Sequence, residues 1–132
     1  MRKSYFCQNI SSYMRNLCII ALIALTLTAC GPYQKALKEK DVKAKYSLAT
    51  KYYEEGKETG KKNSLRRAVR LLEQILPQFK GKPQGEHLAF IYADSYYRLK
   101  DYINSGYEFE RFAKTYRSSD KAEEAAYKGA KS

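Results

Sequence analysis

Apolar side chains recur at three- and four-residue steps along most of the chain after residue 40, which is the spacing of amphipathic helices. The pattern predicts a first helix from an N-cap at Asp41 to the glycines Gly56 and Gly60, and a second from Ser64 to Pro77. A third helix is predicted over residues 86–99, and a fourth from Tyr102 onward after a turn at Lys100 and Asp101. A fifth is predicted over residues 121–130. Turn-forming residues in 78–84 predict a loop. Since no segment alternates apolar and polar residues as a strand does, we expect an all-α fold.

The expected helix pairs repeat one another. Ala49, Tyr52 and Tyr53 recur as Ala93, Tyr96 and Tyr97, and Ala68, Leu72 and Ile75 recur as Ser105, Phe109 and Phe112. The first pair is expected to have the longer turn, from Gly56 to Asn63. The second pair places small and large residues at the packing positions of a tetratricopeptide motif, although Arg117 stands where that motif usually has proline. We therefore expect two tetratricopeptide-like hairpins and the first helix of a third over residues 41–132.

The N-terminal part has a different pattern. Basic residues precede an apolar run from Leu17 to Ala29, and small residues at Thr28 and Ala29 stand before Cys30. This order is typical of a bacterial lipoprotein signal that ends in a lipobox. A transmembrane helix is the alternative, but these thirteen residues are fewer than the roughly 20 that span a bilayer. We expect residues 1–29 to be a signal peptide and Cys30 to carry covalent lipid, with residues 30–40 as a polar tether in which Pro32 disfavours helix at the start.

Cleavage would change the charge and the available chemistry. The chain has a formal net charge of +11, and losing the three basic residues of 1–29 leaves +8. Cys7 and Cys18 would leave with the signal, so no thiol would remain for a disulfide, a metal or a nucleophile. His87 is the single histidine, and Glu123 and Glu124 are adjacent on a helix and face different directions. We expect no enzyme, no catalytic residue, no metal and no cofactor besides the lipid.

A basic cluster surrounds the first predicted turn. Its members are Lys57, Lys61, Lys62, Arg66, Arg67 and Arg70. Such a cluster serves solubility as a solvated face, or it is attracted to anionic lipid headgroups near an anchor. A nucleic-acid partner is not expected for an exported lipoprotein.

The chain resembles the outer-membrane assembly lipoprotein family BamD, in a form like that of Bacteroidetes. The resemblance lies in the lipobox and in the segments YSLATKYYEEG (46–56), LLEQILPQFKG (71–81), YADSYYRLKDY (92–102) and AEEAAY (122–127). It implies a periplasmic scaffold that is lipid-anchored in the outer membrane. The implied partners are the barrel-forming assembly subunit and unfolded β-barrel precursors. The family has around five repeats, so the resemblance implies that the chain corresponds to its N-terminal portion, without the repeats that dock onto that subunit.

Repeats of this type present their first helices along a concave face, where an extended peptide can lie. The repeat register places a candidate peptide-binding groove at Lys43, Tyr46, Thr50, Tyr53, Glu54, His87, Phe90, Asp94, Tyr97 and Arg98. Aromatic segments could stack on Tyr53, Phe90 and Tyr97, and Arg98 or Lys43 could bind a terminal carboxylate. Packing is the competing role for each tyrosine, and we assign Tyr52, Tyr92 and Tyr96 to it. The alternative function is a cell-envelope adaptor that coordinates peptidoglycan and outer-membrane processes.

Overall fold

The computed structural model describes residues 14–20 and 31–132, and all the regular structure within these ranges is helical. Residues 14–20 form one helical segment. The following helices are α2 (Pro32–Lys38), α3 (Val42–Thr59), α4 (Lys62–Phe79), α5 (Pro83–Leu99), α6 (Tyr102–Thr115) and α7 (Ala122–Lys131). The chain divides into two compact units, Met1–Lys35 and Ala36–Ser132, and every buried hydrophobic residue described lies in the second unit. That unit therefore has a core of its own.

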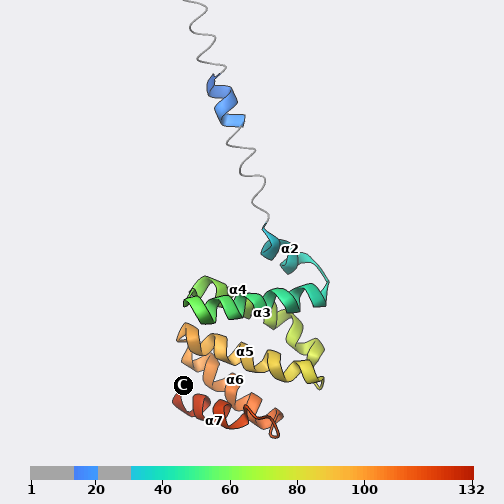
Figure 1. The fold of residues 1–132 in the computed structure, drawn as a ribbon, viewed down its shortest axis with the longest axis vertical. Helices are drawn as coiled ribbons and strands as arrows, with labels where there is room; N and C mark the ends of the chain where they lie inside the picture. Colours follow the sequence, from blue (N-terminus) through green and yellow to red (C-terminus); the bar gives the residue numbers. More distant parts are fainter. Residues whose placement is uncertain (1–13, 21–30) are drawn as a thin grey trace, which may run out of the picture. The chain divides into compact units, whose positions relative to one another are not determined.

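Helices α3 to α7 pack in chain order, each against the next (Figure 1). Helices α3 and α4 form one hairpin, α5 and α6 form a second, and α7 follows as a first helix. Helix α3 also contacts α5, so first helices lie beside one another. The predicted all-α fold of helical-hairpin repeats is confirmed.

Local signals explain both ends of α3. The Asp41 side chain accepts hydrogen bonds from the backbone amides of Lys43 (2.8 Å) and Ala44 (3.2 Å), so the predicted N-cap is present. Gly60 ends the helix with φ of 69°, a conformation that suits glycine. The expectation that Gly56 interrupts the helix was wrong. Gly56 is buried, and a Cβ built there would come within 2.6 Å of Leu65 Cγ, so its glycine allows α3 and α4 to approach closely.

Helix α4 is longer than its sequence signals suggested. It begins at Lys62, which places Ser64 inside the first turn, and it continues through Pro77 to Phe79. Proline removes one backbone donor near the end of the helix, while the Phe79 ring still packs against Tyr46 with centroids 5.7 Å apart. The predicted long turn from Gly56 to Asn63 is wrong, because only residues 60 and 61 separate α3 from α4.

Two further segments predicted to be irregular are helical. Pro32 stands at the start of α2, within the expected tether, where its missing N–H costs no hydrogen bond. Pro83 likewise opens α5 earlier than predicted, which leaves residues 80–82 as the connection from α4. Most of the predicted signal peptide, and the predicted lipidation site Cys30, lie outside the described residues.

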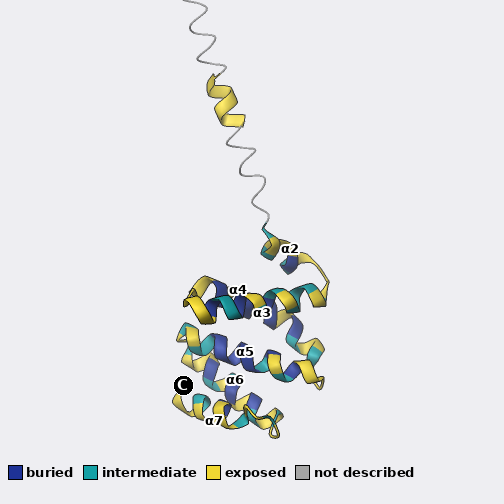
Figure 2. Ribbon diagram, viewed as in Figure 1, coloured by how far each residue is buried: buried dark blue, intermediate teal, exposed yellow. Residues whose placement is uncertain are grey.

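The second hairpin and α7 share an aromatic core. Buried Phe90, Ala93, Phe109, Phe112 and Ala125 form one cluster. The Phe90 ring meets those of Phe109 and Phe112 edge-on, with centroids 5.8 and 5.5 Å apart, an arrangement that aromatic rings favour. Figure 2 shows buried residues along the facing surfaces of α3 to α6, whereas most of α7 is exposed. Packing therefore attaches α7 to the stack by one face.

Candidate functional site

The predicted groove residues lie on the first helices α3 and α5, and their exposure differs widely. Tyr53, Phe90 and Asp94 are buried, with 4%, 5% and 1% of their surface exposed. Tyr97, Tyr46, Thr50 and Glu54 are partly exposed, and Lys43, His87 and Arg98 are exposed. Tyr53 and Phe90 therefore offer a ligand little ring surface. Of the three rings expected to stack on a bound segment, Tyr97 keeps the most.

Two predicted residues, Tyr53 and Arg98, and the unpredicted Lys128 meet around the buried carboxylate of Asp94, which was also predicted. Asp94 Oδ2 accepts hydrogen bonds from the Tyr53 hydroxyl (2.8 Å) and from Arg98 Nε (2.5 Å). Asp94 Oδ1 accepts one from Lys128 Nζ (2.7 Å), and Lys128 also pairs with Glu124 at 2.8 Å. We call Asp94, Tyr53, Arg98, Lys128 and Glu124 the Asp94 cluster. It connects the first helices of all three repeats, α3, α5 and α7.

The cluster keeps its charges despite burial. Burial alone would raise the pKa of Asp94, but hydrogen bonds from Lys128, Arg98 and Tyr53 outweigh it and hold that pKa below its ordinary value. Burial would lower the pKa of Lys128, yet its bonds to Asp94 and Glu124 raise it. Burial, reinforced by the Asp94 carboxylate, raises the pKa of the Tyr53 phenol. Asp94 is therefore an anion, and Lys128 a cation, at neutral pH.

Lys128 also contacts the aromatic rings of the second hairpin. Its ammonium lies 5.5 Å from the Phe90 ring centroid and 5.7 Å from those of Tyr97 and Phe109. Lys121 is exposed, and its ammonium lies 4.4 Å from the centroid of the same Phe90 ring. Such positions attract cations to ring faces. The open part of this surface is consequently a mixture of amines and aromatic edges.

Sequence reasoning missed Lys128 and Lys121 because the groove register was assigned on α3 and α5 alone. The signal was available, since α7 was predicted as the first helix of a third repeat and its own face belongs to the same surface. Lys128 is also a charged residue among the small side chains of the segment AAYKGA. Extending the register to α7 would have placed a lysine near the groove.

The remaining groove residues do not join the cluster. The Tyr46 ring packs against Phe79, and the Thr50 hydroxyl donates to the Tyr46 carbonyl at 3.0 Å within the same helix. Glu54 pairs with Lys57 at 3.4 Å. Exposed Lys43 and His87 lie on the outer parts of α3 and α5. Of the predicted groove, the structure thus brings Tyr53, Asp94 and Arg98 into contact, whereas Lys43 and His87 are exposed.

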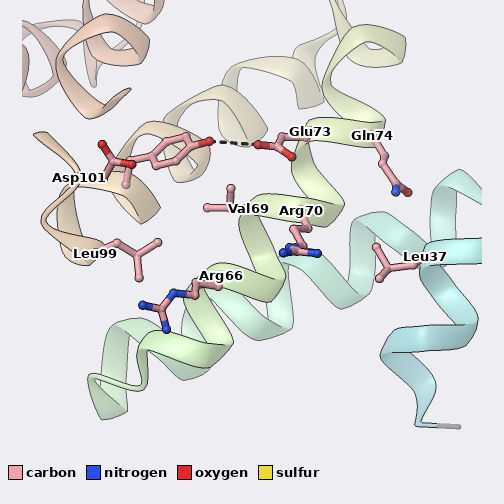
Figure 3. A pocket seen from close by; sticks show the side chains of 9 residues that line it. Leu37, Arg66, Val69, Arg70, Glu73, Gln74, Leu99 and Asp101 are labelled. Carbon is pink, nitrogen blue, oxygen red and sulfur yellow. Dashed lines mark hydrogen bonds between the residues drawn. The ribbon is translucent and has the colours of Figure 1, made fainter. Parts of the chain in front are cut away.

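A second concave feature lies on the α4 side of the stack (Figure 3). It is an open depression of about 820 Å³ lined by Leu37, Arg66, Val69, Arg70, Glu73, Gln74, Tyr96, Leu99 and Asp101. Glu73 Oε1 accepts hydrogen bonds from the hydroxyls of Tyr96 (3.1 Å) and Tyr92 (3.3 Å). The bonds agree with the packing role predicted for these two tyrosines.

Within the described ranges, no group of three or more His, Cys, Asp or Glu side chains is placed so that it could hold a metal ion. None of the helices described is both long and apolar enough to cross a membrane.

The fold and the Asp94 cluster define an all-α protein of helical-hairpin repeats whose first helices are joined by an ionic network around a buried carboxylate. Comparisons with models of protein families, with curated proteins and with solved structures found no match to the chain.

Proposed function

We propose that the chain is a lipid-anchored periplasmic scaffold of outer-membrane β-barrel assembly, and that it binds unfolded barrel precursors on the face formed by α3, α5 and α7. In this proposal the protein is a binding protein and not an enzyme. Covalent lipid on Cys30 holds it at the periplasmic face of the outer membrane. The proposal draws on the lipobox and on the sequence resemblance described above.

The observation that carries the proposal is the composition of the first-helix face. Around the buried Asp94 it presents partly exposed Tyr97 together with exposed Lys121, a cation that pairs with no carboxylate among the residues that the structure describes. Aromatic edges favour an aromatic side chain, and cations favour a carboxylate. A strand that ends in an aromatic residue and a free carboxylate offers both groups.

Site-specific photocrosslinking in intact cells tests where clients bind. A photoreactive residue at His87, which is exposed on α5, is expected to capture unfolded barrel precursors. Tyr107 is the matched control, because it is 63% exposed but lies on the second helix α6. Equal capture at both positions, or none at His87, would contradict the proposal. Capture of peptidoglycan-synthesis proteins alone would favour the envelope adaptor.

The anchor needs its own test. Cells fed an alkyne-bearing palmitate are expected to label the wild-type chain and the Cys18→Ser variant, and to leave Cys30→Ser unlabelled. Labelling that survives in Cys30→Ser would show that Cys30 is not the acylated residue.

A further inference from the structure

The basic cluster around the α3–α4 turn divides into two groups in the structure. Lys57 pairs with Glu54, and Lys61 pairs with Glu55 at 3.1 Å, so these two lysines are compensated by α3. Arg67 lies over the Tyr52 ring, 5.5 Å from its centroid. Lys62, Arg66 and Arg70 are exposed and form no ion pair with any residue that the structure describes.

These three residues lie on one face of α4. They are four residues apart, which aligns them along the helix over about 12 Å. We call Lys62, Arg66 and Arg70 the basic stripe. Like charges at this spacing repel each other and destabilise the helix. Folding therefore gains nothing from the alignment, which suits an external anion.

The two acids that line the same depression as Arg66 and Arg70 already have partners. Glu73 accepts from the hydroxyls of Tyr92 and Tyr96, and Asp101 caps α6 through the Asn104 amide at 3.3 Å and the Asn104 side chain at 2.8 Å. Figure 3 shows the guanidinium groups of Arg66 and Arg70 apart from Glu73, whose carboxylate bonds to Tyr96, and both arginines are exposed. The two arginines thus keep their charge available to solvent.

Apolar side chains border these cations. Leu37 of α2 and Leu99 at the end of α5 line the same depression as Arg66 and Arg70. A row of cations beside leucines matches a lipid headgroup layer, where long basic side chains reach phosphates above the hydrocarbon. A nucleic-acid backbone offers phosphates alone.

We propose that the basic stripe is a contact surface for anionic phospholipid headgroups. The orientation rests on the proposed lipid anchor, since Leu37 is seven residues after Cys30 and an extended chain of that length spans at most about 25 Å. Arg66 and Arg70 of the stripe line the same depression as Leu37. Its charge complementarity does not depend on the anchor.

Binding of residues 31–132 to lipid vesicles tests the inference without the lipid. This segment contains the whole unit Ala36–Ser132, with its own core, and lacks Cys30. It is expected to sediment with vesicles that contain phosphatidylglycerol and not with pure phosphatidylcholine, and added salt should release it. Each Lys or Arg near an anionic surface contributes a factor of about five in affinity, so Lys62→Gln/Arg66→Gln/Arg70→Gln is expected to bind on the order of a hundredfold more weakly.

A matched triple variant keeps the test specific. Lys114→Gln/Arg117→Gln/Lys131→Gln removes the same charge from exposed positions on or next to α6 and α7 and is expected to retain most of the binding. Circular dichroism checks that both variants remain helical. Equal weakening by both triples, or no preference for anionic vesicles, overturns the inference. Tighter, stripe-dependent binding to a DNA duplex at the same salt would also overturn it.

Failure here leaves the proposed function intact, because the stripe is on α4 and client capture is measured at His87 on α5. If client capture were absent while vesicle binding was retained, the proposed scaffold function would be contradicted and the proposed lipid contact surface would still be supported.

Discussion

The Asp94 cluster and the basic stripe are both rich in Lys and Arg, yet they place those charges in opposite environments. In the cluster, Arg98 and Lys128 converge on a carboxylate that is 1% exposed. In the stripe, Lys62, Arg66 and Arg70 face solvent and pair with no carboxylate in residues 14–20 or 31–132. The difference teaches that the first set of charges holds helices together, whereas the second is available for a partner. Net charge alone distinguishes neither role.

Removing the central carboxylate should give the largest effect. Asp94→Asn leaves Lys128 and Arg98 facing an uncharged amide, and we expect it to lower the free energy of unfolding by about 2–4 kcal/mol. The lower limit reflects the partial exposure of Arg98, which water screens. Urea unfolding followed by circular dichroism measures the change.

Glu124→Gln is the control for this variant, because Glu124 also pairs with Lys128 but its side chain is 46% exposed. It should cost less than about 1 kcal/mol. If Asp94→Asn proved as mild as Glu124→Gln, the cluster would not hold the repeats together.

Acid should weaken the same network progressively. The pKa of Asp94 is held below its ordinary value in the folded state, so its contribution is present above the unfolded pKa of about 4 and is lost as pH falls through the lower folded value. The melting temperature of the wild type should drop over this acid range more than that of Asp94→Asn. Parallel curves for the two proteins would assign acid sensitivity to other carboxylates.

Removing one neutral donor should have a smaller effect. Tyr53→Phe deletes the hydroxyl that donates to Asp94 and is expected to cost about 1–2 kcal/mol, because the carboxylate keeps its two cations. Tyr46→Phe is the control: the Tyr46 ring packs on Phe79, and no hydrogen bond of its hydroxyl occurs within the described part of the chain. Similar losses in the two variants would show that the Tyr53 bond adds little.

Changes in the stripe should affect stability least. Arg66→Gln/Arg70→Gln relieves repulsion along α4 and is expected to leave stability unchanged or to raise it by up to about 0.5 kcal/mol at low salt. Thermal melts at low and high salt test this, since added salt should cancel the difference. Arg67→Gln, which removes a cation from the Tyr52 ring, should instead cost about 0.5–1 kcal/mol. A marked loss in the double variant would mean that the stripe stabilises the fold.

Helix positions were largely predictable from the sequence because local signals determine them. The Asp41 cap, the Gly60 terminus and the short turn at residues 100–101 all lie where the pattern placed them. The errors at Gly56, Pro32 and Pro77 came from assigning these residues a breaking role. Gly56 serves a close helix contact, Pro32 opens a helix, and Pro77 lies near the end of one, where a lost donor is tolerated.

The candidate site was predicted only in part. The repeat register placed Tyr53, Asp94 and Arg98 on one surface, and the structure brings them together. It did not predict that Phe90 would be covered, because that cover comes from α7, which contributes Lys128 and Lys121. It also did not predict that Tyr53 would be buried with its hydroxyl bonded to Asp94. Periodicity assigns residues to a face and cannot show what covers that face.

By itself, the sequence determined the all-α class, the helical-hairpin repeat and most helix ends, because these depend on side-chain spacing and on hydrogen bonds within a few residues. Only the tertiary structure decided how the charges are used. Asp94 meets Tyr53 from 41 residues earlier and Lys128 from 34 residues later, while Arg66 and Arg70 find no acid across the stack. A charge becomes a structural link or an exposed contact surface according to what packing brings within about 3 Å of it, and packing joins residues that are distant in the chain.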